Sequence, residues 1–299
     1  MSLLRWLCQL AKPAKQTKFR MPELPEVQTI VNDLNKKILG RRIAAFWSDT
    51  PRIFKYTSIP KIKKGIKGYK IKSIARRAKN ILITLQNRDE KLLLIHPKLT
   101  GHLLLAVNDL RKNKKNYIRA AFYLDNGLIL NFSDLRKFGK IIFGGKKKIE
   151  SLPDLKNLGP EPLDANFKAG KFINLINSRK TSIKQTLLNQ EVVSGIGNIY
   201  SDETLWLAKI NPFTPANRLT NKQLKTLFLK IKKVLRKAIK LRGSSVRNYR
   251  DTTGGRGGYA QIKKVYGREN QACYRCKTKI KRIKMGVRSA HFCPRCQKE

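Results

Sequence analysis

Four cysteines near the C-terminal end constrain the folding of this chain more than any other feature. They form two Cys-x2-Cys pairs that are separated by sixteen residues. This spacing is typical of a tetrahedral zinc ion held between two turns of a small β-hairpin ribbon. Four thiolates leave no open coordination position, so we expect one structural Zn²⁺ rather than a catalytic metal. The ligands of this zinc ribbon, which we place in residues 263–299, are Cys273, Cys276, Cys293 and Cys296.

The hydrophobic pattern in the first half of the chain is that of one helix followed by many short strands. Apolar residues recur at helical spacing from Pro25 and stop at Gly40, a residue that favours helix ends. Alternating β-rich runs with turn residues between them then predict a β-sandwich or barrel within residues 21–150. The predicted strands are 43–48, 69–75, 80–85, 92–95, 102–107, 117–124, 128–132 and 140–143.

The second half of the chain has a different pattern. The proline-containing residues 151–165 show little periodicity and predict a linker. Helical periodicity dominates residues 166–262, which we interpret as a separate helical domain. Within it, the Gly-, Ser- and Thr-rich residues 243–259 predict a mobile loop. The predicted helices are 168–177, 182–189, 199–208 and 220–241.

The charge of the chain is extreme. It contains 66 Lys and Arg residues against 19 Asp and Glu residues, for a net charge of +47. An excess of this size indicates a polyanionic partner, and nucleic acid fits best. A genomic bias towards Lys, Ile and Asn would inflate the charge, but it would not by itself remove acidic residues. No apolar run approaches the length that crosses a membrane, so we expect no membrane partner.

The segment Met21–Val27 has the form of a protein N-terminus, although twenty residues precede it. If translation began at Met21 and that residue were removed, Pro22 would carry a free secondary amine. An α-amino group titrates at about 7.7–8.0, so this amine would be substantially neutral and nucleophilic at physiological pH. Its attack on a sugar C1′ would give an iminium, with Glu23 and Glu26 placed for proton transfer. The alternative is an ordinary helix start with proline and glutamate in its first turn.

Several further motifs occur in one order along the chain: Pro22–Glu26, Arg76–Lys79, Asp134–Gly139, Leu158–Leu163, Val193–Tyr200, Val265–Arg268 and the cysteine pairs. Each motif is weak alone, whereas their shared order is very specific. From Met21 to Gln297 the chain resembles the formamidopyrimidine-DNA glycosylases, which are bifunctional base-excision enzymes for oxidised purines. The resemblance implies an α+β multidomain fold: an N-terminal β-sandwich with an initial α-helix, a helix–two-turn–helix domain and a C-terminal zinc ribbon. It also implies that the 243–259 loop caps the lesion.

The resemblance also implies catalytic roles for particular residues. Pro22 would be the Schiff-base nucleophile, and Glu23 the acid or base that assists opening of the sugar ring. Lys79, at a hairpin tip between two predicted strands, would donate a proton during β-elimination. Arg288 matches an arginine associated with δ-elimination and phosphate contact. Glu203 matches an acid near the active site, with a plain helix carboxylate as the alternative.

DNA contacts are implied in the same way. Chemistry on a base within a duplex requires the nucleotide to be extruded and the gap to be filled. Arg136 and Phe138 match the pair that intercalates, and Leu99 stands in the place of a third wedge that is usually Met. The positions implied to contact backbone phosphate are Tyr117, where many relatives have His, Arg179, and Asn198, which caps a tight turn.

The expected function is removal of 8-oxoguanine and formamidopyrimidines from duplex DNA, followed by β,δ-elimination at the AP site. An endonuclease VIII-type enzyme for oxidised pyrimidines is the sibling alternative. The Pro-Glu-Leu-Pro-Glu start and the long 243–259 loop favour the purine enzyme. A non-catalytic DNA-binding relative is the third hypothesis, because Pro22 within a longer chain would be an unreactive amide. The presence of Glu23, Lys79 and Arg288 argues against it, since binding alone does not need them.

Residues 1–20 contain five basic and no acidic residues. They predict either a start codon assigned upstream in error or a genuine extension, such as an organelle-targeting segment. Clustering of four of the five cysteines at one end favours a reduced compartment over a secreted disulfide framework. We therefore expect a monomer in the bacterial cytoplasm, associated with the nucleoid through DNA binding. Cys8 has no role that the sequence indicates.

Overall fold

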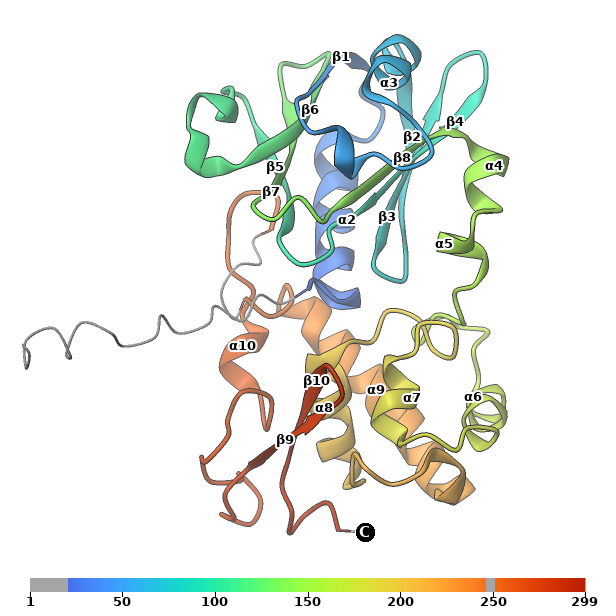
Figure 1. Cartoon of the computed structure of the whole chain (residues 1–299), viewed down its shortest axis with the longest axis vertical. Helices are drawn as coiled ribbons and strands as arrows, with labels where there is room; N and C mark the ends of the chain where they lie inside the picture. The colour runs from blue at the N-terminus through green and yellow to red at the C-terminus, as the bar shows by residue number, and fades with distance from the viewer. Residues whose placement is uncertain (1–20, 246–250, 299) are drawn as a thin grey trace, which may run out of the picture.

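The structure, a computed structural model, describes residues 21–245 and 251–298. The predicted extension 1–20 and the middle of the predicted 243–259 loop lie outside the described residues. A β-rich N-terminal half is joined through a helix and a connector to a helical half that carries a small β-hairpin (Figure 1). The predicted α+β class is confirmed.

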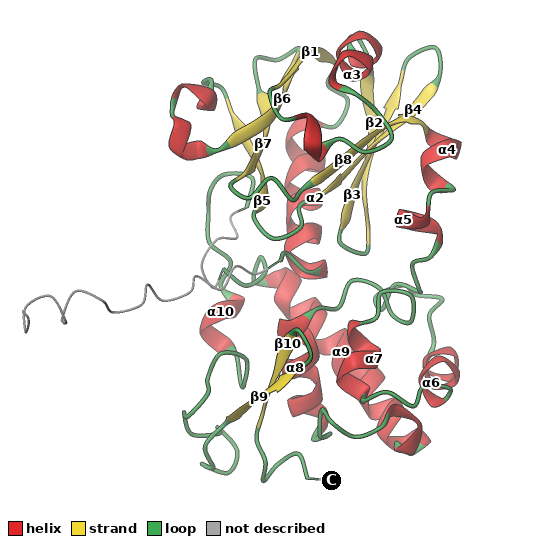
Figure 2. Cartoon of the chain, viewed as in Figure 1, coloured by secondary structure: helices red, strands yellow, loops and turns green. Residues whose placement is uncertain are grey.

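Two four-stranded antiparallel sheets form the N-terminal half and enclose an apolar core (Figure 2). The strand order is β1-β6-β7-β5 in one sheet and β2-β3-β4-β8 in the other. The strands are β1 (Ile43–Ser48), β2 (Lys70–Arg77), β3 (Asn80–Gln86), β4 (Glu90–His96), β5 (Gly101–Ala106), β6 (Ile118–Leu124), β7 (Ile129–Asp134) and β8 (Lys140–Gly145).

The second sheet is buried on both faces, which explains its continuous apolar runs. In β8, Ile141 lies in the core between the sheets, whereas Ile142 lies in an outer cluster with Leu94 of β4. Neighbouring residues of a strand point to opposite faces, so a run of apolar residues fills both clusters. The short helices α4 (Lys146–Glu150) and α5 (Pro153–Lys156) cover the outer cluster.

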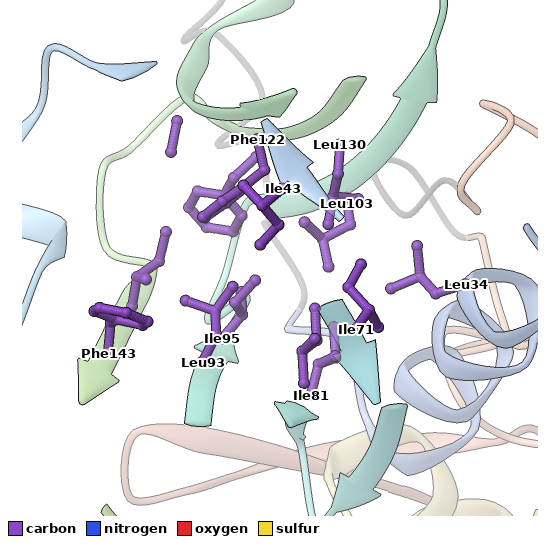
Figure 3. Close-up of a cluster of buried hydrophobic side chains, with 14 of the residues drawn as sticks. Leu34, Ile43, Ile71, Ile81, Leu93, Ile95, Leu103, Phe122, Leu130 and Phe143 are labelled. Atoms are coloured by element: carbon purple, nitrogen blue, oxygen red, sulfur yellow. The ribbon is translucent and has the colours of Figure 1, made fainter. Parts of the chain in front are cut away.

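Helix α2 (Leu24–Ile38) belongs to both halves of the molecule. Its apolar stripe from Val27 to Ile38 packs into the core between the sheets, while Leu24 packs into the core of the helical half. Figure 3 shows Leu34 of this helix facing the core beside residues of both sheets. The first turn of α2 therefore lies at the junction of the two halves.

The 20-residue helix α9 (Asn221–Lys240) is the centre of the helical half. Thr220 and Gln223 form a capping box at its start, and its apolar stripe packs against α2, α6 and α8. Among the described residues, no helix is long and apolar enough to cross a bilayer. The other helices are α6 (Ala169–Asn177), α7 (Ile183–Leu188), α8 (Asn198–Ala208) and α10 (Tyr259–Ile262).

A two-stranded hairpin, β9 (Lys281–Met285) and β10 (Arg288–Phe292), lies near the C-terminal end of the described residues and packs on α8. Trp206 of α8, Val265 and Ile280 form a small apolar cluster with the cysteines. This cluster attaches the hairpin region to the helical half.

Each strand and helix predicted above is present, with limits within two residues of the prediction. The predictions missed α4, α5 and α10, and α5 lies within the predicted 151–165 linker. They also missed the helix α3 (Ile59–Ile66), in which Ser58 caps the first turn through the amide of Lys61. This helix has only eight residues, so its apolar spacing covers little more than two turns and is easily missed in the sequence.

Replacing Leu34 by Ala should lower the free energy of unfolding by about 2–5 kcal/mol, because the side chain is fully buried and its loss leaves a cavity. Leu229 is 57% exposed on α9 and provides the control. Its replacement by Ala should change the same quantity by less than about 0.5 kcal/mol. Denaturant titration measures both variants, and equal effects would contradict the assigned core.

Candidate active site

The carboxylate of Glu23 sits on the N-terminus of α8. It accepts hydrogen bonds from the backbone amides of Gly197 (2.8 Å), Ile199 (2.9 Å) and Tyr200 (3.4 Å). A helix N-terminus stabilises an anion through its free amides and its dipole. Only 4% of Glu23 is exposed, and this burial raises the pKa of its carboxyl although the nearby Lys79 ammonium and the amides oppose the shift. Pro22 is buried directly before it.

Gly197 makes this close approach possible. A Cβ atom at this position would lie 2.3 Å from the carboxyl carbon of Glu23, well inside van der Waals contact. Gly197 is also the N-cap residue of α8, and Asn198 is the first residue of the helix. Asn198 thus follows the glycine that leaves room for the carboxylate, and its predicted role at the turn stays a prediction.

Lys79 lies in the two-residue turn between β2 and β3, and the turn is buried at the junction of the two halves. Its ammonium donates a hydrogen bond to the carbonyl oxygen of Ile196 (2.9 Å), one residue before Gly197. Burial lowers the pKa of Lys79 to about 8, with Glu23 opposing the shift and Arg288 adding to it. An amine with this pKa can both release and accept a proton near neutral pH.

Glu161 holds the turn that carries Lys79. Its carboxylate accepts a hydrogen bond from the amide of Ala78 (2.5 Å) and pairs with Arg76 (2.7 Å). Arg77 donates to the carbonyl of Leu158 (2.7 Å). In the sequence, the segments of Glu161 and of the two arginines stand out only as motifs, without an indicated role. The one available indication was a single acid between two prolines in a chain with few acids.

Glu26 forms the other side of the site. Its carboxylate accepts hydrogen bonds from the amide of Glu23 (2.9 Å), the hydroxyl of Tyr200 (2.5 Å) and the amide of Ser244 (2.7 Å). Burial, followed by the charge of Glu23, raises the pKa of Glu26 to about 7 against these donors. Gly243 has a positive φ of 78°, and a Cβ there would lie 2.7 Å from the Glu26 carboxylate. The start of the 243–259 loop is thus packed against Glu26.

Glu203 has a structural contact that the sequence did not indicate. Its buried carboxylate accepts hydrogen bonds of 2.8–3.0 Å from the consecutive amides of Lys264, Val265 and Tyr266. It therefore fixes the segment that leads into the cysteine region. Its predicted place near the active site stays a prediction. Arg179 is exposed and follows Ser178, the C-cap residue of α6. Its predicted phosphate contact stays a prediction.

The residues predicted to fill the DNA gap share one support. The buried carboxylate of Asp134 accepts hydrogen bonds from the hydroxyl of Thr100 and the amides of Arg136 (3.2 Å) and Gly139 (2.7 Å). It thereby ties the loop of Leu99 to the loop that presents Arg136 and Phe138. Phe138 is 43% exposed, and the Arg136 guanidinium lies 4.7 Å from the centre of its ring. Tyr117 is 39% exposed next to this loop, where its carbonyl oxygen accepts a hydrogen bond from the amide of Asp134.

The four predicted zinc ligands converge. Their Sγ atoms lie within 4.8 Å of one another, with separations of 3.3–3.9 Å for three of the pairs. Sulfur atoms bound tetrahedrally at about 2.3 Å from zinc are about 3.8 Å apart, so the donor set fits Zn²⁺. The chain therefore has one structural zinc site, at Cys273, Cys276, Cys293 and Cys296.

A buried ionic network connects the zinc region to α8. Lys184 donates to Asp202 (2.5 Å) and to the carbonyl of Ser289 (2.7 Å), and Asp202 also accepts from the amide of His291 (3.0 Å). The Lys184 and Asp202 side chains are fully buried. Because Ser289 follows Arg288 in β10, this network fixes the exposed Arg288 relative to α8, and Arg288 is close enough to affect the pKa of Lys79.

Comparison with known proteins identifies the family. The profile of the formamidopyrimidine-DNA glycosylase N-terminal domain matches residues 21–141, the H2TH domain of the same enzymes matches residues 158–250, and the zinc finger found in FPG and IleRS matches residues 270–298. The chain is 40% identical over 278 residues to the formamidopyrimidine-DNA glycosylase of Herpetosiphon aurantiacus. The aligned region covers 93% of this chain and 100% of the relative. The chain belongs to the formamidopyrimidine-DNA glycosylase family.

Solved structures of this family have the same fold. Lactococcus lactis Fpg in complex with DNA containing an abasic site superposes with a TM-score of 0.85 at 34% identity, covering 93% of this chain and all of that one. MutM (Fpg) from Thermus thermophilus superposes with a TM-score of 0.82 at 32% identity, covering 92% and 98% of the two chains. The family resemblance inferred from the sequence motifs is confirmed.

Replacing Gly197 by Ala should lower the rate of excision of an oxidised purine from duplex DNA by about a hundredfold, because the added methyl group displaces the Glu23 carboxylate. Gly170→Ala is the matched control, since a Cβ there meets nothing within 4 Å. Excision assays and thermal unfolding of both variants measure the effect. Unchanged excision by Gly197→Ala would show that the contact with α8 does not position Glu23 for the reaction.

Replacing Glu26 by Gln should change the pH dependence of stability. A carboxyl group with a pKa raised from 4.5 to about 7 binds more protons in the folded than in the unfolded chain between these values. Its contribution to the free energy of unfolding is therefore fully present below about pH 4.5 and is lost as the pH rises to about 7. The free energy of unfolding falls by an amount on the order of 3 kcal/mol over this range. Denaturant titrations from pH 5 to 8 should show a shallower decline for Glu26→Gln than for the unmodified chain. Parallel curves would contradict the shift.

Proposed function

We propose that this protein removes oxidised purines from duplex DNA as a base-excision repair glycosylase. The observation that carries the proposal is the juxtaposition of Glu23, on the N-terminus of α8, with the buried amine of Lys79, next to Pro22. Two proton-transfer groups with opposite charges and shifted pKa values lie beside the residue that can supply a nucleophilic amine. Residues that only bind DNA need no such arrangement.

In the proposed reaction, the neutral amine of an N-terminal Pro22 attacks C1′ of the damaged nucleotide. The glycosidic bond breaks, the base leaves with its bonding electron pair and takes up a proton, and an iminium remains on the opened sugar. Glu23 would donate a proton to the ring oxygen, and the burial that raises its pKa favours this role. Lys79 would exchange protons during the elimination.

We further propose that the iminium intermediate makes the protein an AP lyase. Loss of a proton from C2′ expels the 3′ phosphate in β-elimination, and a second elimination expels the 5′ phosphate. Arg288, held by the Lys184 network, is exposed and cationic, as required to stabilise a departing phosphate.

The proposed DNA contacts follow the same geometry. Arg136, Phe138 and Leu99 are supported together by Asp134 and would occupy the gap left by the extruded nucleotide. Tyr117, Arg179 and Asn198 would contact backbone phosphates. We propose a monomer acting on DNA in the bacterial cytoplasm, since the similar glycosylases named above are bacterial.

Oxidised pyrimidines are a second candidate substrate class. The Lactococcus lactis enzyme, with a fold similar to that of this chain, has been crystallised with DNA containing an oxidised pyrimidine. The Pro-Glu-Leu-Pro-Glu start of this chain favours purines. Parallel assays with 8-oxoguanine and 5-hydroxycytosine duplexes distinguish the classes, and faster excision of the pyrimidine would overturn the preference proposed here.

Borohydride reduces an iminium to a stable amine, and it therefore tests the mechanism directly. Two forms of the protein, one beginning at Met1 and one at Met21, are incubated with an 8-oxoguanine duplex and borohydride. We expect the Met21 form to give a covalent adduct that mass spectrometry maps to an N-terminal Pro22. The matched control is the Met21 form with Pro22→Gly, in which a primary terminal amine replaces the secondary one. This variant should form the adduct more slowly.

Absence of an adduct in both forms, while zinc content and duplex binding remain intact, would overturn the enzymatic proposal. That result would leave the non-catalytic DNA-binding protein. An adduct mapped to a lysine instead would retain the lyase activity and exclude Pro22 as its nucleophile.

A further inference from the structure

The first cysteine turn, residues 273–276, docks on the C-terminal end of α8. Arg275 in this turn donates hydrogen bonds from its guanidinium to the carbonyl oxygens of Trp206 (2.6 Å) and Leu207 (3.2 Å). Both carbonyls belong to the last turn of α8, where a helix has carbonyl oxygens without intrahelical partners and where its dipole favours a cation. The cysteine turn therefore supplies a cap for the helix.

The second cysteine turn, residues 293–296, reaches the same end of α8 through Gln297. The side-chain amide of Gln297 donates to the carbonyl oxygen of Ile210 (2.8 Å), two residues after the helix, and accepts from the backbone amide of Cys293 (2.9 Å). Only 1% of Gln297 is exposed. Both cysteine turns are thus fixed to the C-terminal end of the helix that holds Glu23 at its N-terminus.

Trp206 is the side chain of α8 that meets both cysteine turns. It is 5% exposed and lies in one apolar cluster with Cys273 and Cys293. The guanidinium carbon of Arg275 lies 3.8 Å from the centre of its ring, which is a favourable cation–π contact. The ring is therefore held between α8 and the first cysteine turn.

The indole N–H of Trp206 is buried, and in the part of the chain that the structure describes it has no oxygen or nitrogen acceptor. Buried donors of this kind normally have a partner. The acceptor at hand is the sulfur of Cys273. Although burial raises the pKa of this thiol, hydrogen bonds from the amides of Arg275 and Cys276 and from the indole N–H hold it below its usual value.

We propose that Trp206 is a positioning residue of the zinc site and that its indole N–H donates a hydrogen bond to the Cys273 thiolate. Four thiolates around one Zn²⁺ carry a net charge of about −2, and a thiolate is a stronger acceptor than a thiol. A donor to one sulfur withdraws part of this charge, which stabilises the ligand set and slows loss of the ion. The inference concerns the zinc site and does not depend on the proposed glycosylase activity.

Trp206→Phe tests the hydrogen bond, because it removes the N–H and keeps an aromatic ring beneath Arg275. The zinc-loaded full chain is mixed with excess chromogenic chelator, and the absorbance of the chelator complex follows zinc release. We expect release to be about 10-fold faster than from the unmodified chain, since partners outside the ligand set contribute about 10- to 100-fold to metal affinity. An unchanged rate would overturn the inference.

Trp47→Phe is the matched control. Trp47 lies in β1, in the other half of the molecule, and an arginine also stacks on its ring, with Arg111 4.5 Å from the ring centre. The substitution therefore removes the same chemical group from a similar setting without a cysteine. It should leave the rate of zinc release unchanged. Thermal unfolding of the zinc-loaded variants shows that each retains its fold.

Phenylalanine is also smaller than tryptophan, so a second variant separates the N–H from the volume of the ring. Benzothienylalanine, placed site-specifically at position 206, has the size of tryptophan with a sulfur atom in place of the N–H. It should release zinc about as fast as Trp206→Phe. Release at the rate of the unmodified chain would assign the effect to packing and overturn the hydrogen bond.

Cobalt(II) in place of zinc gives a readout that packing alone would not change. The energy of sulfur-to-cobalt charge transfer depends on the electron density at sulfur, and an N–H donor stabilises the sulfur electrons. Removing the donor should therefore shift this absorption band to longer wavelength in Trp206→Phe and in the benzothienylalanine variant. The band of Trp47→Phe should stay in place. Identical spectra for all four proteins would overturn the inference.

Discussion

The contact between the Glu23 carboxylate and the N-terminus of α8 is the constraint on which the rest of the structure depends. It joins the first turn of α2, which is rooted in the β-sandwich, to a helix of the other half. The carboxylate would be costly to bury without these amides, and the amides would be unsatisfied without the carboxylate. Leu24 packs into the helical core at the same place. A reactive centre at this junction is therefore assembled only when both halves are folded.

Burial also sets the chemistry of the centre. It raises the pKa of Glu23 and Glu26 and lowers that of Lys79, so each group is driven towards its neutral form. Their mutual attraction opposes this shift for Glu23 and Lys79 without abolishing it. With pKa values of about 7 and about 8, Glu26 and Lys79 exchange protons near neutral pH, which a solvent-exposed carboxylate and lysine would not do. The same burial destabilises the fold at the pH where the enzyme would work, and the contacts of Glu161 and α8 compensate.

Local patterns in the sequence predicted the elements well, because β alternation and helical periodicity report which face of each element is buried. The zinc ligands were predictable for a similar reason, since their spacing alone specifies the chemistry. Glu161 and Lys184 were not predictable. Their partners are distant in the sequence, as with Lys184 and Ser289, and in a chain with 66 basic residues no periodicity marks the few that are paired in the interior. The contact of Glu203 was not predictable either, because its partners are backbone amides, which leave no trace in residue types.

Asp134 has a consequence for how the protein meets DNA. Because one buried carboxylate organises the loops of Leu99, Arg136 and Phe138, these residues hold their relative positions before any duplex arrives. The conformational entropy of ordering the loops is lost once, when the chain folds, and not at each encounter. Undamaged base pairs vastly outnumber lesions, so nearly every encounter is unproductive. If these residues enter the duplex as proposed, a preordered set can test and leave each site quickly. The speed of the search is then limited by the DNA, whose stacked bases must yield, rather than by the protein.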